Sequence, residues 1–141
     1  MLTSTIQRLL PAGSYLDAGC GDGRYLAALP EFGPLPARIV GVDIAESILR
    51  TARKATAAAG FEPELVAQTS RACPSKAKEF DLVVSIQVLE HLLDPVAGAR
   101  ELARVLRPSG ALVLSTASPH ARAAFDFPHS AYSLARRTSR D

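Results

Sequence analysis

YLDAGCGDG, residues 15–23, is an apolar run that ends in three glycines at alternate positions. Because glycine has no side chain, such a loop lets a ligand lie directly on the backbone. A helix that begins after Gly23 would offer unpaired N–H groups to a carboxylate or a phosphate. A tight turn that binds no ligand is the simpler alternative. The stretch therefore predicts a strand, an accessible loop and a helix, in that order.

Short apolar or β-branched runs alternate with longer segments rich in Ala, Leu and Arg. This alternation is typical of βαβ units and a mostly parallel sheet. We expect five strands, at residues 14–18, 38–43, 64–67, 80–86 and 111–116. Right-handed crossovers would arrange them in the order 3-2-1-4-5. The sequence therefore predicts one doubly wound α/β domain over residues 1–116.

Helices are expected over residues 23–29, 47–59 and 95–106. Pro30 should end the first of these helices, and Gly60 should cap the second. Asp94 and Pro95 pair an N-cap residue with a proline at the first helical position, which predicts the start of the third.

The remaining segments carry no regular pattern. Residues 68–79 are polar and aperiodic, which indicates a loop, and Pro108 and Gly110 predict a turn before the fifth strand. Residues 117–141 contain prolines, histidines and an arginine-rich end, so we expect an irregular tail with a frayed terminus.

Composition narrows the class of protein. Of the 141 residues 48% are hydrophobic, enough for a buried core, and the net charge of +2 gives no reason to expect nucleic-acid binding. No stretch approaches the roughly 20 apolar residues of a membrane span, so we expect a cytoplasmic protein. The two cysteines are too few for a disulfide scaffold, and no metal site is expected.

Glycine spacing separates two classes of ligand. A dinucleotide-binding loop has its third glycine three residues after the second, where this sequence has Arg24. The earlier position of Gly23 disfavours an NAD(P)-dependent oxidoreductase. Asp43 ends the second strand about 20 residues after the loop, where a carboxylate can accept hydrogen bonds from both hydroxyls of a ribose. A helix N-cap is the alternative role for Asp43, and the two roles are compatible.

Four segments together resemble the class I S-adenosylmethionine-dependent methyltransferases, in particular the small-molecule group related to ubiquinone and menaquinone biosynthesis methyltransferases. They are LDAGCGDG, RIVGVDIAESIL, FDLVVSIQVLEHLLDP and ARVLRPSGALVLST, in the family's order. The resemblance implies a Rossmann-like fold and S-adenosyl-L-methionine as cofactor. It also implies methyl transfer to a small-molecule acceptor by in-line displacement.

The resemblance further implies which residues contact the cofactor. Asp17 and the three glycines would line its methionine end, Asp43 would hold the ribose, and Ile44 would pack on the adenine. Where the family has an Asp beside the adenine amine, this sequence has Gln68-Thr69-Ser70, whose amide or hydroxyl groups can also accept a hydrogen bond. The expected cofactor-binding residues are Asp17, Gly19, Cys20, Gly21, Gly23, Asp43, Ile44, Gln68, Thr69, Ser85 and Gln87.

Glu90-His91 resembles the family's Glu-His pair near the methyl acceptor. This makes His91 the candidate catalytic residue, as a base or as a group that orients the substrate. A histidine that only caps a loop is the alternative.

Two departures from the family pattern affect the expected function. Ser109 replaces the first of two glycines that normally follow the proline before the fifth strand, and a turn tolerates serine. The family's antiparallel sixth and seventh strands are expected to be missing. The fifth strand would then be a free edge, and self-association through it is expected. A binding module without catalytic activity is the second functional hypothesis.

Overall fold

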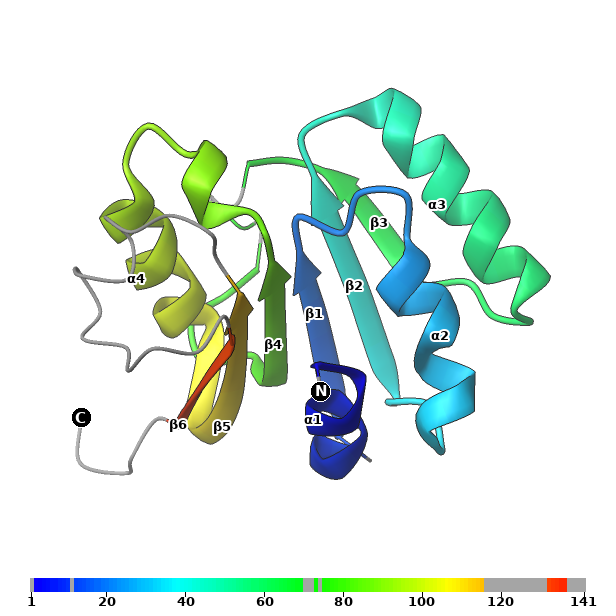
Figure 1. Ribbon diagram of the computed structural model, residues 1–141, viewed down its shortest axis with the longest axis horizontal. Coiled ribbons are helices and arrows are strands. Elements are labelled where there is room, and N and C mark those ends of the chain that lie inside the picture. Colours follow the sequence, from blue (N-terminus) through cyan, green and yellow to red (C-terminus); the bar gives the residue numbers. More distant parts are fainter. Residues whose placement is uncertain (1, 11, 70–72, 74, 116–131, 137–141) are drawn as a thin grey trace.

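The computed structural model describes residues 2–10, 12–69, 73, 75–115 and 132–136. Six strands form one sheet in the order β3-β2-β1-β4-β5-β6, with the first five parallel and β6 antiparallel to β5 (Figure 1). The strands are β1 (Ser14–Ala18), β2 (Arg38–Asp43), β3 (Glu64–Ala67), β4 (Phe80–Ile86), β5 (Leu106–Ser115) and β6 (Tyr132–Arg136). The predicted order 3-2-1-4-5 is confirmed.

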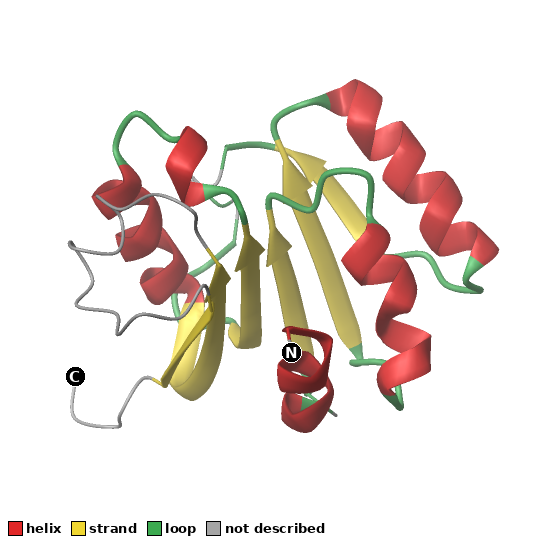
Figure 2. Cartoon of the chain, in the orientation of Figure 1, coloured by secondary structure: helices red, strands yellow, loops and turns green. Residues whose placement is uncertain are grey.

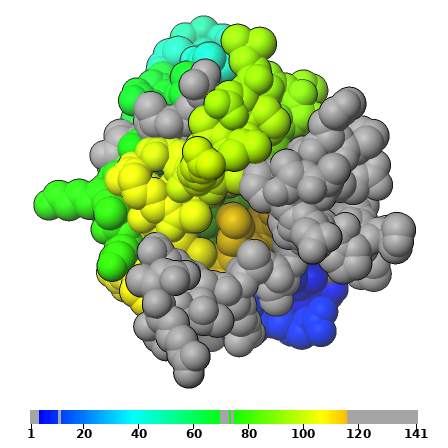
Figure 3. Space-filling model, turned by 90° about the vertical axis from the view of Figure 1, so that its left-hand side faces the viewer, coloured from blue at the N-terminus to red at the C-terminus, as the bar shows by residue number. Residues whose placement is uncertain are grey.

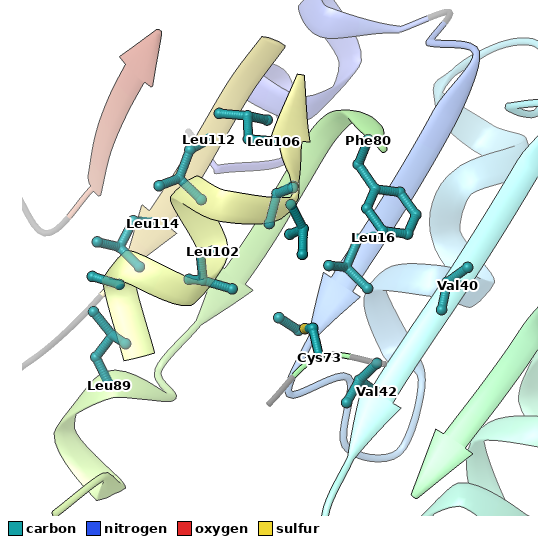
Figure 4. Packing of buried hydrophobic residues seen from close by; sticks show 14 residues of the cluster. Leu16, Val40, Val42, Cys73, Phe80, Leu89, Leu102, Leu106, Leu112 and Leu114 are labelled. Carbon is teal, nitrogen blue, oxygen red and sulfur yellow. The ribbon is translucent and has the colours of Figure 1, made fainter. Parts of the chain in front are cut away.

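Helices cover both faces of the sheet (Figure 2). The helices are α1 (Leu2–Leu9), α2 (Arg24–Phe32), α3 (Glu46–Ala58), the 3₁₀ helix η1 (Leu89–His91) and α4 (Pro95–Val105). Tyr15 of β1 packs in one apolar cluster with residues of α1, α2 and α3. Its neighbour Leu16 points to the opposite face and joins a cluster with Leu102 of α4 and Leu89 of η1 (Figure 4). The fold is therefore a three-layer α/β/α arrangement, with α4 and β5 on the side shown in Figure 3.

The sheet is built around β1, whose five residues are all buried. Asp17 of β1 lies opposite Gly41 of β2 and Val84 of β4. Parallel strands place their carboxyl ends along one edge of the sheet, and ligands of open α/β sheets bind there. This register therefore gathers the segments that follow β1, β2 and β4 at one edge.

The prediction that the sheet lacks a sixth strand is wrong, because β6 pairs with β5 and places Leu112 opposite Ala135. An unpaired strand edge offers N–H and C=O groups that another strand can bind, which explains the pairing. It also removes the premise for self-association through a free β5 edge. Residues 116–131 and 137–141, which include the predicted end of the fifth strand, lie outside the described residues.

The start of β5 also differs from the prediction. Leu106 pairs with Phe80, and Ala111 pairs with Leu82, so residues 107–110 form a bulge between two paired positions. The predicted turn before the fifth strand is therefore a bulge inside a longer strand.

Most helix boundaries follow the predicted ones. Helix α2 is an exception, because it continues past Pro30 to Phe32. A proline in the last turn removes a single helical hydrogen bond, which the helix end tolerates. Helix α1 was not expected and buries Ile6 completely. Gly60, with φ +93°, follows α3 as predicted. Among the described residues, no helix combines the length and apolar character needed to cross a bilayer.

Candidate functional site

The loop between β1 and α2 folds back over the end of β2. The N–H groups of Gly19 and Cys20 donate hydrogen bonds to the Val42 carbonyl, with N–O distances of 2.7 and 2.9 Å. Gly19, Gly21 and Gly23 all have positive φ angles, of +83°, +54° and +79°. Residues other than glycine adopt this left-handed backbone conformation only at an energetic cost, so the alternate glycines make the tight loop feasible.

The three glycines meet different surroundings. A Cβ at Gly19 would lie 2.3 Å from Val88 Cγ2, and one at Gly23 would lie 2.9 Å from the Ala52 Cα and Cβ atoms. A Cβ at Gly21 would meet no described atom within 4 Å. Gly19 therefore allows the close packing of Val88, and Gly23 allows α2 to pack on α3. Gly21 leaves open space above the loop.

Asp43 joins the loop to the end of β2. Its Oδ2 accepts a hydrogen bond of 2.9 Å from the Gly21 N–H, and its Oδ1 accepts one of 3.1 Å from the Ala45 N–H. Its carbonyl accepts a further hydrogen bond from the Gln68 N–H at 2.8 Å. Ala45 is the N-cap of α3, so the alternative N-cap role for Asp43 is not what the structure shows. Asp43 instead ties together the segments that follow β1, β2 and β3.

A pocket of about 310 Å³ lies at these carboxyl ends. The size falls at the lower end of the range for small-molecule sites. Ile44 lines it with a side chain that is 74% exposed, and Gln87 and His91 are exposed beside it. The lining residues are Gly19, Asp43, Ile44, Gln68, Thr69, Ile86, Gln87, Val88, His91 and Leu92. Seven of the residues that the sequence singles out are thus brought together, while Ser70 lies outside the described residues.

The other five expected cofactor-binding residues do not line the pocket; they are Asp17, Cys20, Gly21, Gly23 and Ser85. Ser85 is fully buried, and its hydroxyl has no hydrogen-bond partner within the described part of the chain. Burial also raises the pKa of the Cys20 thiol well above its ordinary value, and the nearby carboxylates of Asp17 and Asp43 add to this effect.

Asp17 lies beneath the glycine loop and is 1% exposed. Its Oδ2 atom has no hydrogen-bond partner among the described residues. Burial, and then the charge of Asp43, raises the pKa of Asp17 to about 7. A buried carboxyl oxygen without a partner is costly, and such groups gather at functional sites. Asp17 would therefore be stabilised in its charged form by a cationic ligand group.

Three apolar residues that line the pocket were not predicted from the sequence: Ile86, Val88 and Leu92. Each lies directly before or after an expected site residue, Gln87 or His91, and this adjacency was the available signal. In the sequence they look like core residues, because apolar residues fill β4 and the segment after it.

The profile of a family described as "Methyltransferase domain" matches residues 16–114. The chain belongs to this methyltransferase family. Its match covers most of β1, all of β2, β3 and β4 and nearly all of β5, and it includes every residue that lines the pocket.

Two similar proteins are themselves named as methyltransferases. A "Ubiquinone biosynthesis O-methyltransferase" from Xanthomonas axonopodis pv. citri is 34% identical over 111 residues, which are 77% of this chain and 45% of the relative. One from Ruegeria pomeroyi is 34% identical over 72% of this chain and 40% of its own length. The methyltransferase chain therefore spans less than half the length of these relatives.

The fold is also similar to that of a methyltransferase of known structure. An S-adenosylmethionine-dependent methyltransferase from Mesorhizobium loti aligns with a TM-score of 0.65 and 25% identity. The alignment covers 82% of this methyltransferase chain and 54% of that one.

Proposed function

We propose that this chain binds S-adenosylmethionine in the pocket and transfers its methyl group to a small-molecule acceptor. The observation that carries the proposal is the pair Asp43-Ile44, which presents a carboxylate and an exposed apolar side chain to the same pocket. A carboxylate can accept hydrogen bonds from ribose hydroxyls, and an exposed isoleucine provides a flat apolar contact for an adenine ring. A nucleoside-bearing ligand matches both.

The charges around the pocket suit a cationic ligand. Asp43 lines the pocket, and no Lys or Arg is among the described residues that do so. Asp17 adds a second, buried carboxyl group beneath the loop. The sulfonium and ammonium groups of S-adenosylmethionine would be attracted to this environment, whereas the diphosphate of a nicotinamide cofactor would be repelled. This favours the methyltransferase function over the alternative oxidoreductase.

Bound S-adenosylmethionine supplies a methyl group on a sulfonium that is already a good leaving group. The chain therefore has to hold an acceptor in line with that bond and exclude water. Ile86, Val88 and Leu92 give the pocket an apolar wall that disfavours water. His91 is exposed at the same wall, where its imidazole can take a proton from an acceptor hydroxyl.

An oxygen nucleophile is the acceptor that we propose. The support comes from the names of the relatives, which are O-methyltransferases of ubiquinone biosynthesis, and from the imidazole of His91 in the pocket wall. A hydroxyl must lose a proton when it is methylated, so a nearby base has a defined task. A binding module without turnover remains the second hypothesis, and it shares the cofactor site but not this step.

A methyl-transfer assay with small phenols and catechols separates these two hypotheses. Turnover in the wild-type protein, lost in His91→Ala while S-adenosylhomocysteine still binds, would support the enzyme. Cofactor binding without turnover of any acceptor would support the binding module. His91→Ala protein with full turnover would remove the base role.

A further inference from the structure

Gln87 has an unusual backbone conformation at the point where the pocket wall begins. Its φ angle is +56°, in the left-handed region that residues other than glycine adopt at a cost. It directly follows β4 and lines the pocket. Strained residues persist where surrounding contacts hold them, and they gather at ligand sites. The contacts of Gln87 therefore identify what fixes this part of the pocket.

Ser115 at the end of β5 holds Gln87 by two hydrogen bonds. The Gln87 backbone N–H donates to the Ser115 carbonyl at 2.9 Å. The Gln87 side chain donates from Nε2 to the Ser115 hydroxyl at 3.1 Å. Ser115 is only 1% exposed, so water competes little with these hydrogen bonds. Both the backbone and the side chain of Gln87 are thus tied to the neighbouring strand.

The conformation of Gln87 sets the direction of the segment that follows it. Val88 comes next, and it packs so closely on Gly19 that no side chain fits there. The Val88 carbonyl accepts a hydrogen bond of 3.0 Å from the His91 N–H, which closes η1. Val88 and His91 both line the pocket. A change at Gln87 would therefore move the pocket wall against the glycine loop.

We infer that Ser115 is a positioning residue. It does not line the pocket, but its two hydrogen bonds to Gln87, the Ser115 clamp, hold Val88 and His91 in place in the pocket wall. The inference rests on the proposed cofactor site, which it deepens. Without the Ser115 hydroxyl, Gln87 loses its side-chain bond and can relax toward negative φ. The wall would then sample more positions, and ligand binding would have to order it again.

A double-mutant cycle tests the clamp with S-adenosylhomocysteine as the probe. Ser115→Ala removes the acceptor, Gln87→Ala removes the donor, and the third variant carries both changes. We expect Ser115→Ala to raise the dissociation constant roughly fivefold, as the loss of one hydrogen bond predicts. The double variant should bind no more weakly than the weaker single variant, because both remove the same interaction. Calorimetry at a temperature where all variants are folded gives the constants.

Thr56→Ala is the matched control for a general loss of stability. Thr56 is fully buried in α3, and its hydroxyl donates to the Ala52 and Arg53 carbonyls at 3.1 and 3.2 Å. It does not line the pocket. We expect Thr56→Ala to unfold at lower urea concentration but to keep the wild-type dissociation constant. If it weakens binding as much as Ser115→Ala does, affinity follows global stability and the positioning role is refuted.

Hydrogen exchange of the ligand-free protein gives a second readout that does not depend on the cofactor. Ser115→Ala should speed amide exchange at residues 88–92, and Thr56→Ala should not. Wild-type protein that fails to bind S-adenosylhomocysteine would refute the proposed function. In that case the amide exchange rates at residues 88–92 would still test whether Ser115 positions this segment. Unchanged exchange at residues 88–92 in Ser115→Ala, or an unchanged dissociation constant in a wild type that binds, would overturn the inference.

Discussion

Asp43 Oδ2 accepts a hydrogen bond from the Gly21 backbone N–H across 2.9 Å, which joins the end of β2 to the glycine loop after β1. The two residues are 22 positions apart in the chain. A carboxylate has more acceptor sites than these backbone contacts use, so Asp43 can shape the loop and still bind hydroxyl groups of a ligand. The Asp43 side chain can therefore both hold the glycine loop and bind a ligand.

Asp43→Ala should weaken the binding of S-adenosylhomocysteine by about 1.5–3 kcal/mol, because it removes charged hydrogen bonds to the ribose and frees the Gly21 loop. Asp22→Ala is the control: Asp22 lies in the glycine loop beside Gly21, pairs with Arg24 at the surface and does not line the pocket. Calorimetry on both variants measures the difference. Equal affinities for wild type and Asp43→Ala, with circular dichroism unchanged, would rule out the ribose role.

Gly21→Val should abolish cofactor binding but leave the fold intact. The Cβ of the new side chain would lie in the open space above the loop, with no described atom within 4 Å, at a backbone cost of about 1–2 kcal/mol for the left-handed conformation. Gly19→Val should lose stability as well, because its side chain would collide with Val88. Urea denaturation and calorimetry distinguish the two. Retained affinity in Gly21→Val would show that the ligand does not lie on this loop.

Asp17→Asn should change how stability depends on pH. The pKa of Asp17 is raised to about 7 by burial and by Asp43, whereas an aspartate in an unfolded chain has a pKa of about 4. Between these values the folded state holds a proton that the unfolded chain has released, so the free energy of unfolding falls as pH rises from about 4 to about 7.

Asparagine cannot ionise, so the free energy of unfolding of Asp17→Asn should not show this decrease with rising pH. The variant should match the wild type near pH 4 and exceed it by up to about 4 kcal/mol above pH 7. Urea denaturation across this range is the measurement. Parallel stability profiles for the two proteins would mean that the Asp17 pKa is not raised.

Ser109→Gly should stabilise the protein by roughly 0.5–1 kcal/mol. Ser109 lies in the bulge of β5 with φ +65°, a conformation that glycine adopts without the steric cost of a Cβ. Ser47→Gly, at an exposed helical position of α3, should destabilise instead. If urea denaturation gives both changes the same sign, the bulge conformation of Ser109 is not strained.

The parallel part of the fold could be predicted from the sequence because its strands are covered on both faces. Phe80–Ile86 is apolar almost throughout for this reason, and the glycine loop marks the end of β1. Once the strand order follows from right-handed crossovers, Asp43, Gln87 and His91 must come to one edge of the sheet. Asp43 and Gln87 could therefore be predicted from local patterns, whereas Gln68, Thr69 and His91 were expected from the family resemblance.

The remainder depends on contacts between distant segments. Strand β6, YSLAR, is short and ends in Arg, and its pairing with β5 provides the stability that its own sequence does not indicate. The buried environment of Asp17 likewise comes from the strands on both sides of β1. Val88 lines the pocket directly after Gln87, whose positive φ a glutamine does not predict.

Calorimetric titration of the wild-type chain with S-adenosylhomocysteine and, separately, with NADH tests the proposed cofactor site. We expect saturable binding of S-adenosylhomocysteine, lost in Gly21→Val, and no comparable binding of NADH. Tighter binding of NADH, or no binding of S-adenosylhomocysteine by the folded wild-type protein, would contradict it.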